Sequence, residues 1–312
     1  MDNILKLSGT IGLKIIQNSK INKKIFIFYD DHSNKSYCNK TKSTKFISEL
    51  FGSIIDKDIA LILEEPFMES DSKIKILWKD SEHLLLFRKF YSKLIDKCSK
   101  KKICKIFPFD IRLSILDISP DEINFNLDNP TDNYKINLIT YFQNINYLFE
   151  LNNYEPKQDS IVCFIKKVFD IYKKSKIYKS LKKRIIDFNE KYELYSNKKT
   201  IYDLIKTHSA SSNFVYEEGY PFVNNHNDNF IDQLDKISSG IMELYSLILT
   251  LLLPHKNIVI YAGYYHSNNL AHIFEKYYNF TEEYSSGITE DINDKSHITN
   301  CIKINSDVMQ FL

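Results

Sequence analysis

The segment IVIYAGYYHSN, which runs from Ile258, decides the fold class of this 312-residue chain because three segments of the same kind accompany it. Each is a short run of aliphatic, β-branched or aromatic residues that ends in charged residues or histidine. The others are IFIFYDDHSN from Ile25, IALILEEPF from Ile59 and ICKIFPFDIR from Ile103. Runs without strict alternation are typical of parallel strands covered by helices on both faces. Since ligands bind at the carboxyl ends of strands in open α/β sheets, these polar ends predict one shared site.

Segments with a helical pattern separate these runs. We expect strands over 24–29, 59–63 and 103–107, with helices over about 43–55 and 81–98 between them. After Pro254 the pattern predicts a strand over 257–262, a helix over about 268–277 and a closing strand over 300–304. Alternating strands and helices predict an α/β fold with a mainly parallel central sheet flanked by helices.

The middle of the chain has a different pattern. Residues 160–195 show apolar residues at helical spacing, with lysine clusters that are typical of a solvated face. A polar loop over 213–229 then leads to a helix over 230–253. The sequence therefore predicts a single α/β domain over 1–312, with a large helical insertion or cap over 155–253.

Composition and charge indicate which partners and which kind of source organism this protein has. Forty-two basic residues nearly balance forty acidic ones, for a net charge of +2, so the chain has no global basic field and nucleic acid is disfavoured as a partner. Binding of nucleic acid through Lys166–Lys191 would require those charges to share one helix face. The richness in Ile, Lys, Asn, Tyr and Phe is typical of an AT-rich genome, as in some bacteria, protists and large cytoplasmic DNA viruses.

Targeting and redox signals predict a cytoplasmic protein, in the host cytoplasm if the source is viral. No secretion signal is visible at the N-terminus, and the most apolar stretch, from Gly240 to Pro254, is too short to span about 30 Å of hydrocarbon. The five cysteines are odd in number and irregularly spaced, which favours free thiols in a reducing compartment over a disulfide framework.

Acidic residues and histidine follow the first two runs. Asp30 and His32 lie two apart, so both side chains point to the same side of an extended strand. Such a pair suits a divalent metal or a general base oriented by an acid, although an ordinary polar turn would have the same pattern. Glu64 and Glu65 cannot both face one crevice, and the strand-end position predicts Glu64 toward the site with Glu65 outward.

The other two runs contribute an arginine and a second histidine. Asp110 and Arg112 repeat the spacing of two, and an arginine fork can bind an anionic intermediate, while the structural alternative is a salt bridge that fixes the strand end. Gly263 and His266 would lie in a turn before the next helix, where glycine permits a sharp path. No P-loop, GxGxxG, GxSxG or HExxH motif is present.

Together, the four strand ends resemble the superfamily that joins erythromycin esterase, the TraB and TIKI proteins and the ChaN-like haem-binding proteins. Gly263–His266 matches its second GxxH motif, and Asp30–His32 is similar to the first, with Tyr29 in place of glycine. The resemblance covers residues of about 20–115 and 255–305. It implies an α/β core whose intermediate acidic and arginine positions are filled by Glu64, Asp110 and Arg112.

These observations lead to one expected function and one alternative. We expect a hydrolase of ester or peptide bonds that acts on a small-molecule or peptide substrate through a metal-bound or histidine-activated water. The expected metal is Mn, Co or Zn, its ligands are Asp30, His32, Glu64 and His266, and the catalytic group is His32, His266, Asp110 and Arg112. The alternative is a catalytically inactive binding or virus–host interaction protein with the same fold, which Tyr29 favours.

Overall fold

The computed structural model describes residues 4–31, 37–54, 57–66, 90–91, 93–94, 105–115, 138–158, 160–192, 194, 214–217, 220–223, 229–289, 299–305 and 307–308. The chain divides into two compact units. Unit 1 comprises Met1–Glu65, Lys79–Phe109 and Leu249–Leu312, and unit 2 comprises Pro66–Trp78 and Asp110–Ile248. The fold is mixed α/β, as the sequence predicts. The helical insertion over 155–253 within a single domain stays a prediction.

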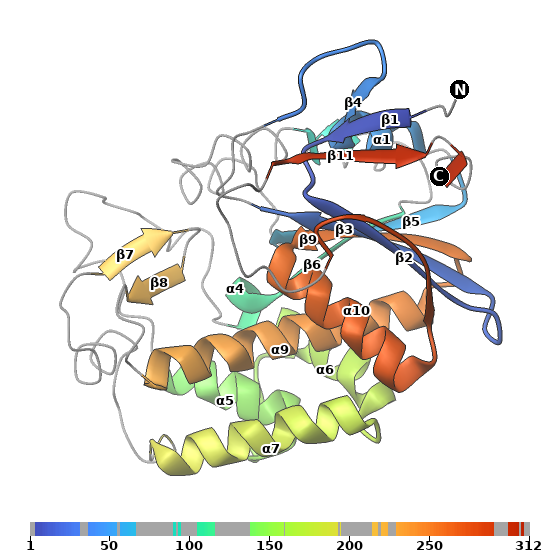
Figure 1. The fold of residues 1–312 in the computed structure, drawn as a ribbon. Helices are drawn as coiled ribbons and strands as arrows, with labels where there is room; N and C mark the ends of the chain where they lie inside the picture. The colour runs from blue at the N-terminus through green and yellow to red at the C-terminus, as the bar shows by residue number, and fades with distance from the viewer. Residues whose placement is uncertain are drawn as a thin grey trace. The chain divides into compact units, whose positions relative to one another are not determined.

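A six-stranded sheet forms the core of unit 1, with strand order β10-β2-β3-β9-β5-β6 (Figure 1). Its strands, in chain order, are β2 (Gly12–Asn18), β3 (Lys23–Asp30), β5 (Ile59–Pro66), β6 (Ile106–Asp110), β9 (Asn257–Gly263) and β10 (Thr281–Gly287). Strand β9 pairs in parallel with both β3 and β5, whereas β2 pairs antiparallel with β3 and β10. The sheet is therefore parallel in its centre and antiparallel at the β10 edge.

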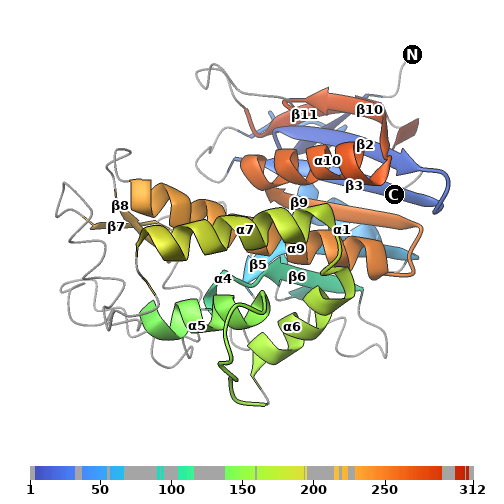
Figure 2. The same ribbon diagram turned by 90° about the horizontal axis from the view of Figure 1, so that it is seen from below.

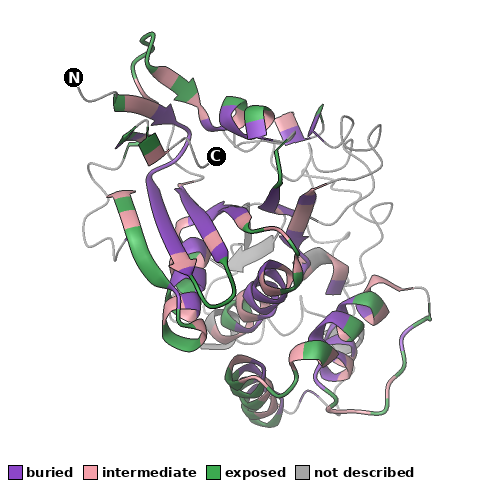
Figure 3. Ribbon diagram, turned by 90° about the vertical axis from the view of Figure 1, so that its right-hand side faces the viewer, coloured by how far each residue is buried: buried purple, intermediate pink, exposed green. Residues whose placement is uncertain are grey.

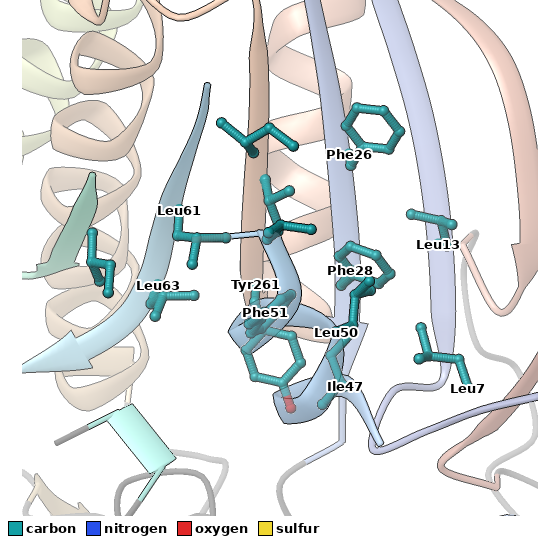
Figure 4. Packing of buried hydrophobic residues seen from close by; sticks show 14 of the residues in the cluster. Leu7, Leu13, Phe26, Phe28, Ile47, Leu50, Phe51, Leu61, Leu63 and Tyr261 are labelled. Atoms are coloured by element: carbon teal, nitrogen blue, oxygen red, sulfur yellow. The ribbon is translucent and has the colours of Figure 1, made fainter. Parts of the chain in front are cut away.

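Helices cover both faces of this sheet. Helix α1 (Ile47–Ile54) packs its buried residues on the face that carries Phe28 and Tyr261, and the Phe51 ring lies 5.9 Å from Phe28 and 5.6 Å from Tyr261 (Figure 4). Helix α10 (Tyr264–Tyr278) covers the opposite face, where Lys14 of β2 contacts Glu275 at 3.1 Å. Since β3 and β9 are buried on both faces, they read as continuous apolar runs in the sequence (Figure 3).

A smaller sheet of unit 1 joins the first and last described strands. Its order is β11-β1-β4, with β1 (Ile4–Ser8), β4 (Thr44–Phe46) and β11 (Cys301–Asn305). Beside it, Cys38 and Cys301 form a disulfide across a sequence separation of 263. The prediction that all cysteines are free thiols is therefore wrong, because chain pairing brings together two cysteines whose spacing gives no local signal. Cys163 is a free thiol.

Unit 2 contains helices and one hairpin among its described residues. The helices are α4 (Arg112–Ile115), α5 (Leu138–Leu148), α6 (Ile161–Tyr172), α7 (Lys176–Lys191) and most of α9 (Asn229–Leu252). Strands β7 (Phe214–Glu217) and β8 (Tyr220–Val223) pair antiparallel. These two strands correct the polar loop predicted over 213–229, where aromatic residues alternate in the sequence on either side of Glu218 and Gly219. No helix of the described residues is long and apolar enough to cross a membrane.

The observed elements differ from the predicted ones mainly at their ends. The strands expected over 24–29, 59–63 and 257–262 are β3, β5 and β9, but β6 begins three residues later than the expected 103–107 strand. The 43–55 helix is divided into β4 and α1, and the 81–98 helix lies largely outside the described residues. Strands β1, β2 and β10 were not predicted, and β10 gives little signal because most of its residues are exposed and polar.

Candidate functional site

The carboxyl ends of β3 and β9 lie where the chain leaves the sheet in opposite directions. From β3 the chain passes through α1 on one face to β5, and from β9 it passes through α10 on the other face to β10. Asp30, the last residue of β3, is level with Gly263, the last residue of β9. Such a topological switch point is where open α/β sheets bind ligands, so this end of the sheet is the candidate site.

Glu64 and His266 meet on the α10 side of this end. The Glu64 Oε1 and His266 Nε2 atoms are 3.6 Å apart, and only 8% and 14% of these side chains are exposed. Glu64 Oε2 also accepts a hydrogen bond of 2.6 Å from the Gly263 backbone N–H. One carboxylate therefore contacts both the start of α10 and the imidazole in its first turn.

Local structure explains this arrangement. Glu64 lies near the end of β5, and the period of two directs it to the face opposite Leu63 and Tyr261. Helix α10 begins at Tyr264, four residues before the expected start at 268, so His266 lies in its first turn and not in a loop. Gly263 is the N-cap residue and has no side chain to cap the helix. The Glu64 carboxylate takes that place, and the helix dipole favours its negative charge.

Aromatic and hydroxyl groups hold the start of α10 against β3. The ring centroids of Tyr29 and Tyr264 are 6.0 Å apart, and Tyr29 is fully buried. The Ser267 hydroxyl lies 3.0 Å from each of the Phe28 and Ala262 carbonyl oxygens. Tyr29 is therefore a packing residue beneath α10.

A second polar group lies on the α1 side of the sheet. Here Asp30, Glu65 and Tyr261 are each at most 3% exposed, and the Tyr261 hydroxyl donates a hydrogen bond of 3.0 Å to the Gly9 carbonyl oxygen. Burial, followed by the negative charge of Asp30, raises the pKa of Tyr261 well above its usual value, and Glu65 adds to the effect. The expectation that Glu65 points outward into solvent is wrong, because the α1 side of β5 is covered.

The predicted site residues can be placed within each unit. Glu64 and His266 lie together on the α10 side, while Asp30 lies on the α1 side. Asp110 and Arg112 belong to unit 2, where the Arg112 Nε and Nη2 atoms donate to the two Asp110 carboxylate oxygens at 2.8 and 2.9 Å. The predicted residue His32 lies outside the described residues.

The positions of the donor side chains show whether they could together bind a divalent metal. Among the described residues, no group of three or more His, Cys, Asp or Glu side chains is placed to hold a metal ion. Glu64 and His266 supply one oxygen and one nitrogen donor, fewer than zinc sites of proteins normally take from the chain. The chemistry below is therefore derived for these two residues alone, and the metal set of Asp30, His32, Glu64 and His266 stays a prediction.

Sequence reasoning missed Tyr261 and Glu65 as parts of the strand ends. Tyr261 lies two positions before Gly263, and only the register of Tyr261 with Leu63 shows that Glu65 reaches the same face. The spacing of two between Tyr261 and Gly263 was the available signal. Comparison with protein-family models, curated proteins and solved structures gives no significant match to this chain.

Proposed function

We propose that this chain is a hydrolase in which His266, oriented by Glu64, activates water to cleave an ester or peptide bond. The observation that carries the proposal is the partly buried Glu64–His266 pair at the topological switch point. A carboxylate that faces one ring nitrogen of histidine fixes the tautomer and stabilises the imidazolium that forms during general-base catalysis. The proposal agrees with the fold that the superfamily resemblance implies.

Each group has a defined task in this mechanism. With Nε2–H directed at Glu64, His266 Nδ1 is the basic nitrogen that removes a proton from water. The resulting hydroxide attacks the carbonyl carbon, and His266 returns the proton to the leaving group as the tetrahedral intermediate collapses. At 3.6 Å the Glu64–His266 contact is longer than a hydrogen bond, as in many apo sites.

Three sequence-based expectations enter the proposal without being required by it. Arg112, paired with Asp110, is a candidate for binding the oxyanion, and a divalent metal is a candidate for binding water. A cytoplasmic location is also a prediction, and the Cys38–Cys301 disulfide argues against a reducing compartment. The substrate class remains a small-molecule or peptide ester or amide.

The test is turnover of p-nitrophenyl butyrate and of a fluorogenic peptide mixture by the wild type and three variants. We expect His266→Ala and Glu64→Gln to lower turnover by about 10²–10⁴-fold, the usual contribution of a general base. His272→Ala is the matched control, because His272 lies on the same helix but is exposed.

Two outcomes would contradict the proposal. Equal turnover in the wild type and His266→Ala would show that His266 is no base, and Glu64 would then only cap α10. Absence of turnover in the wild type with all probes would favour the alternative, an inactive binding protein. Elemental analysis of the same samples tests the metal prediction separately.

A further inference from the structure

The helix pair α6–α7 of unit 2 concentrates the positive charge of the chain. Between Lys166 and Lys191 there are ten basic and three acidic residues, a net charge of +7, whereas the whole chain carries +2. The rest of the chain is therefore net negative, at −5. The positive charge of the chain is therefore concentrated in one helical segment.

Most of these basic side chains are exposed and share no acidic partner. Lys166 and Lys173 pair with Glu150 at 3.3 Å, so they serve the packing of unit 2. Six others are exposed and form no ion pair with any part of the described chain: Lys167, Lys174, Lys176, Lys179, Lys183 and Arg184. We call these six residues the cationic surface.

The cationic surface does not stabilise the helix that carries most of it. The first turn of α7 has no acidic residue and contains Lys176 and Lys179, whose charges oppose the positive end of the helix dipole. Lys179 and Lys183 are four residues apart, a spacing at which like charges repel on a helix. Lys176 and Lys179 are therefore not placed to stabilise the start of α7, and their charges are available to an external anion.

Exposed apolar side chains adjoin the cationic surface on α6. Phe164 is 48% exposed and Ile171 is 60% exposed, and a spacing of seven places them on one helix face with Lys167 between them. A short turn joins α6 to α7 (Figure 2). Lys174 lies in this turn, three positions after Ile171. Apolar and cationic side chains therefore alternate along one face of α6, and Lys174 lies two residues before the first lysine of α7.

We propose that this α6–α7 surface binds the surface of an anionic lipid bilayer. Lysine-rich segments are attracted to anionic headgroups, and exposed Phe and Ile side chains insert at the boundary of the acyl chains. Nucleic acid explains the lysines but not Ile171, because bases are held by stacking rings and forked arginines, and five of the six cations are lysines. The bilayer is thus the partner whose charge and apolar interior match both sets of residues.

The test is co-sedimentation of the full chain with phosphatidylcholine vesicles that contain or lack phosphatidylserine. We expect binding only to the anionic vesicles, with release by salt. Each lysine near the surface contributes about fivefold to binding, so Lys176→Gln/Lys179→Gln/Lys183→Gln should lower it by more than about a hundredfold. Lys40→Gln/Lys42→Gln/Lys45→Gln removes the same charge from exposed positions of unit 1 and should change binding little.

The contribution of the exposed apolar side chains is tested with a separate matched control. Phe164→Ser/Ile171→Ser should weaken binding to anionic vesicles roughly tenfold or more, whereas Ile21→Ser, at a 48% exposed residue of unit 1, should not. Equal binding to neutral vesicles, an equal loss in both lysine triples, or no effect of the Phe164/Ile171 change would each overturn the proposal. Binding of a single-stranded RNA probe without binding of vesicles would also overturn it, in favour of nucleic acid.

Discussion

Loss of the Cys38–Cys301 disulfide should destabilise unit 1 strongly. The bond closes a loop of 263 residues, and the chain-entropy model assigns to a loop of that length about 5.6 kcal/mol at room temperature. If unit 2 stays folded, the flexible part of the loop is shorter, but the logarithmic dependence lowers the figure by only about 1 kcal/mol. Since native disulfides usually contribute about 2–5 kcal/mol, we expect Cys38→Ser to lower the free energy of unfolding by about 3–5 kcal/mol.

Guanidinium titration followed by far-ultraviolet circular dichroism measures this change. Cys301→Ser should have the same effect as Cys38→Ser, and the double variant should add nothing, because either substitution alone removes the whole bond. The wild type in reductant should unfold like the variants. Cys163→Ser is the control, since that thiol is free and its loss should cost within about 0.5 kcal/mol.

An unchanged unfolding midpoint in both Cys38→Ser and Cys301→Ser would refute this reasoning. Alkylation and peptide mapping of the denatured protein give an independent check. Cys38 and Cys301 should react only after reduction, whereas Cys163 should react in either condition. Labelling of Cys38 without reductant would show that the bond is absent in the isolated protein.

Further predictions concern the core and the pH dependence of stability. Phe51→Ala should cost about 3–5 kcal/mol in chemical denaturation, because its buried ring contacts Phe28 and Tyr261; a loss below 1 kcal/mol would contradict the packing. Burial lowers the pKa of His255, so its contribution to stability is present above its unfolded value of 6.5 and lost as the pH falls below it. His255→Gln should reduce the loss of unfolding free energy as the pH falls below 6.5. An unchanged loss would contradict this role of His255. Burial raises the pKa of Tyr141 to about 12, so stability should decline as the pH rises from 10, and Tyr141→Phe should reduce that decline in thermal unfolding curves.

Much of the core of unit 1 was predictable because its strands carry a strong local pattern. Buried on both faces, β3, β5 and β9 need apolar side chains at nearly every position, and the sequence shows this directly. The edge strand β10 was missed for the opposite reason, because TEEYSSG is mainly exposed and its pairing with β2 depends on backbone hydrogen bonds that any residue can make. The β7–β8 hairpin and the disulfide were missed as well.

The candidate site was predictable in its residue types but only partly in its geometry. Polar residues at the strand ends pointed to Glu64 and His266, which lie 3.6 Å apart although 202 positions separate them. The same reasoning placed Asp30 with them and Glu65 outward, whereas the structure has both acids buried near Tyr261. The period of two shows which residues share a face, but it does not show which helix will cover that face.

The sequence by itself determined the α/β class, the positions of the central strands and the acids and histidine at their ends, because these depend on local periodicity and on short-range sterics. Only the tertiary structure decided that β9 lies between β3 and β5, that Glu64 reaches the start of α10, and that Cys38 meets Cys301. Those contacts join residues about 200 or more positions apart, and they form when the packing of whole elements offsets the entropy of closing long loops. A local sequence pattern does not show whether packing offsets the entropy of loop closure. The order of the strands could therefore be read only from the tertiary structure.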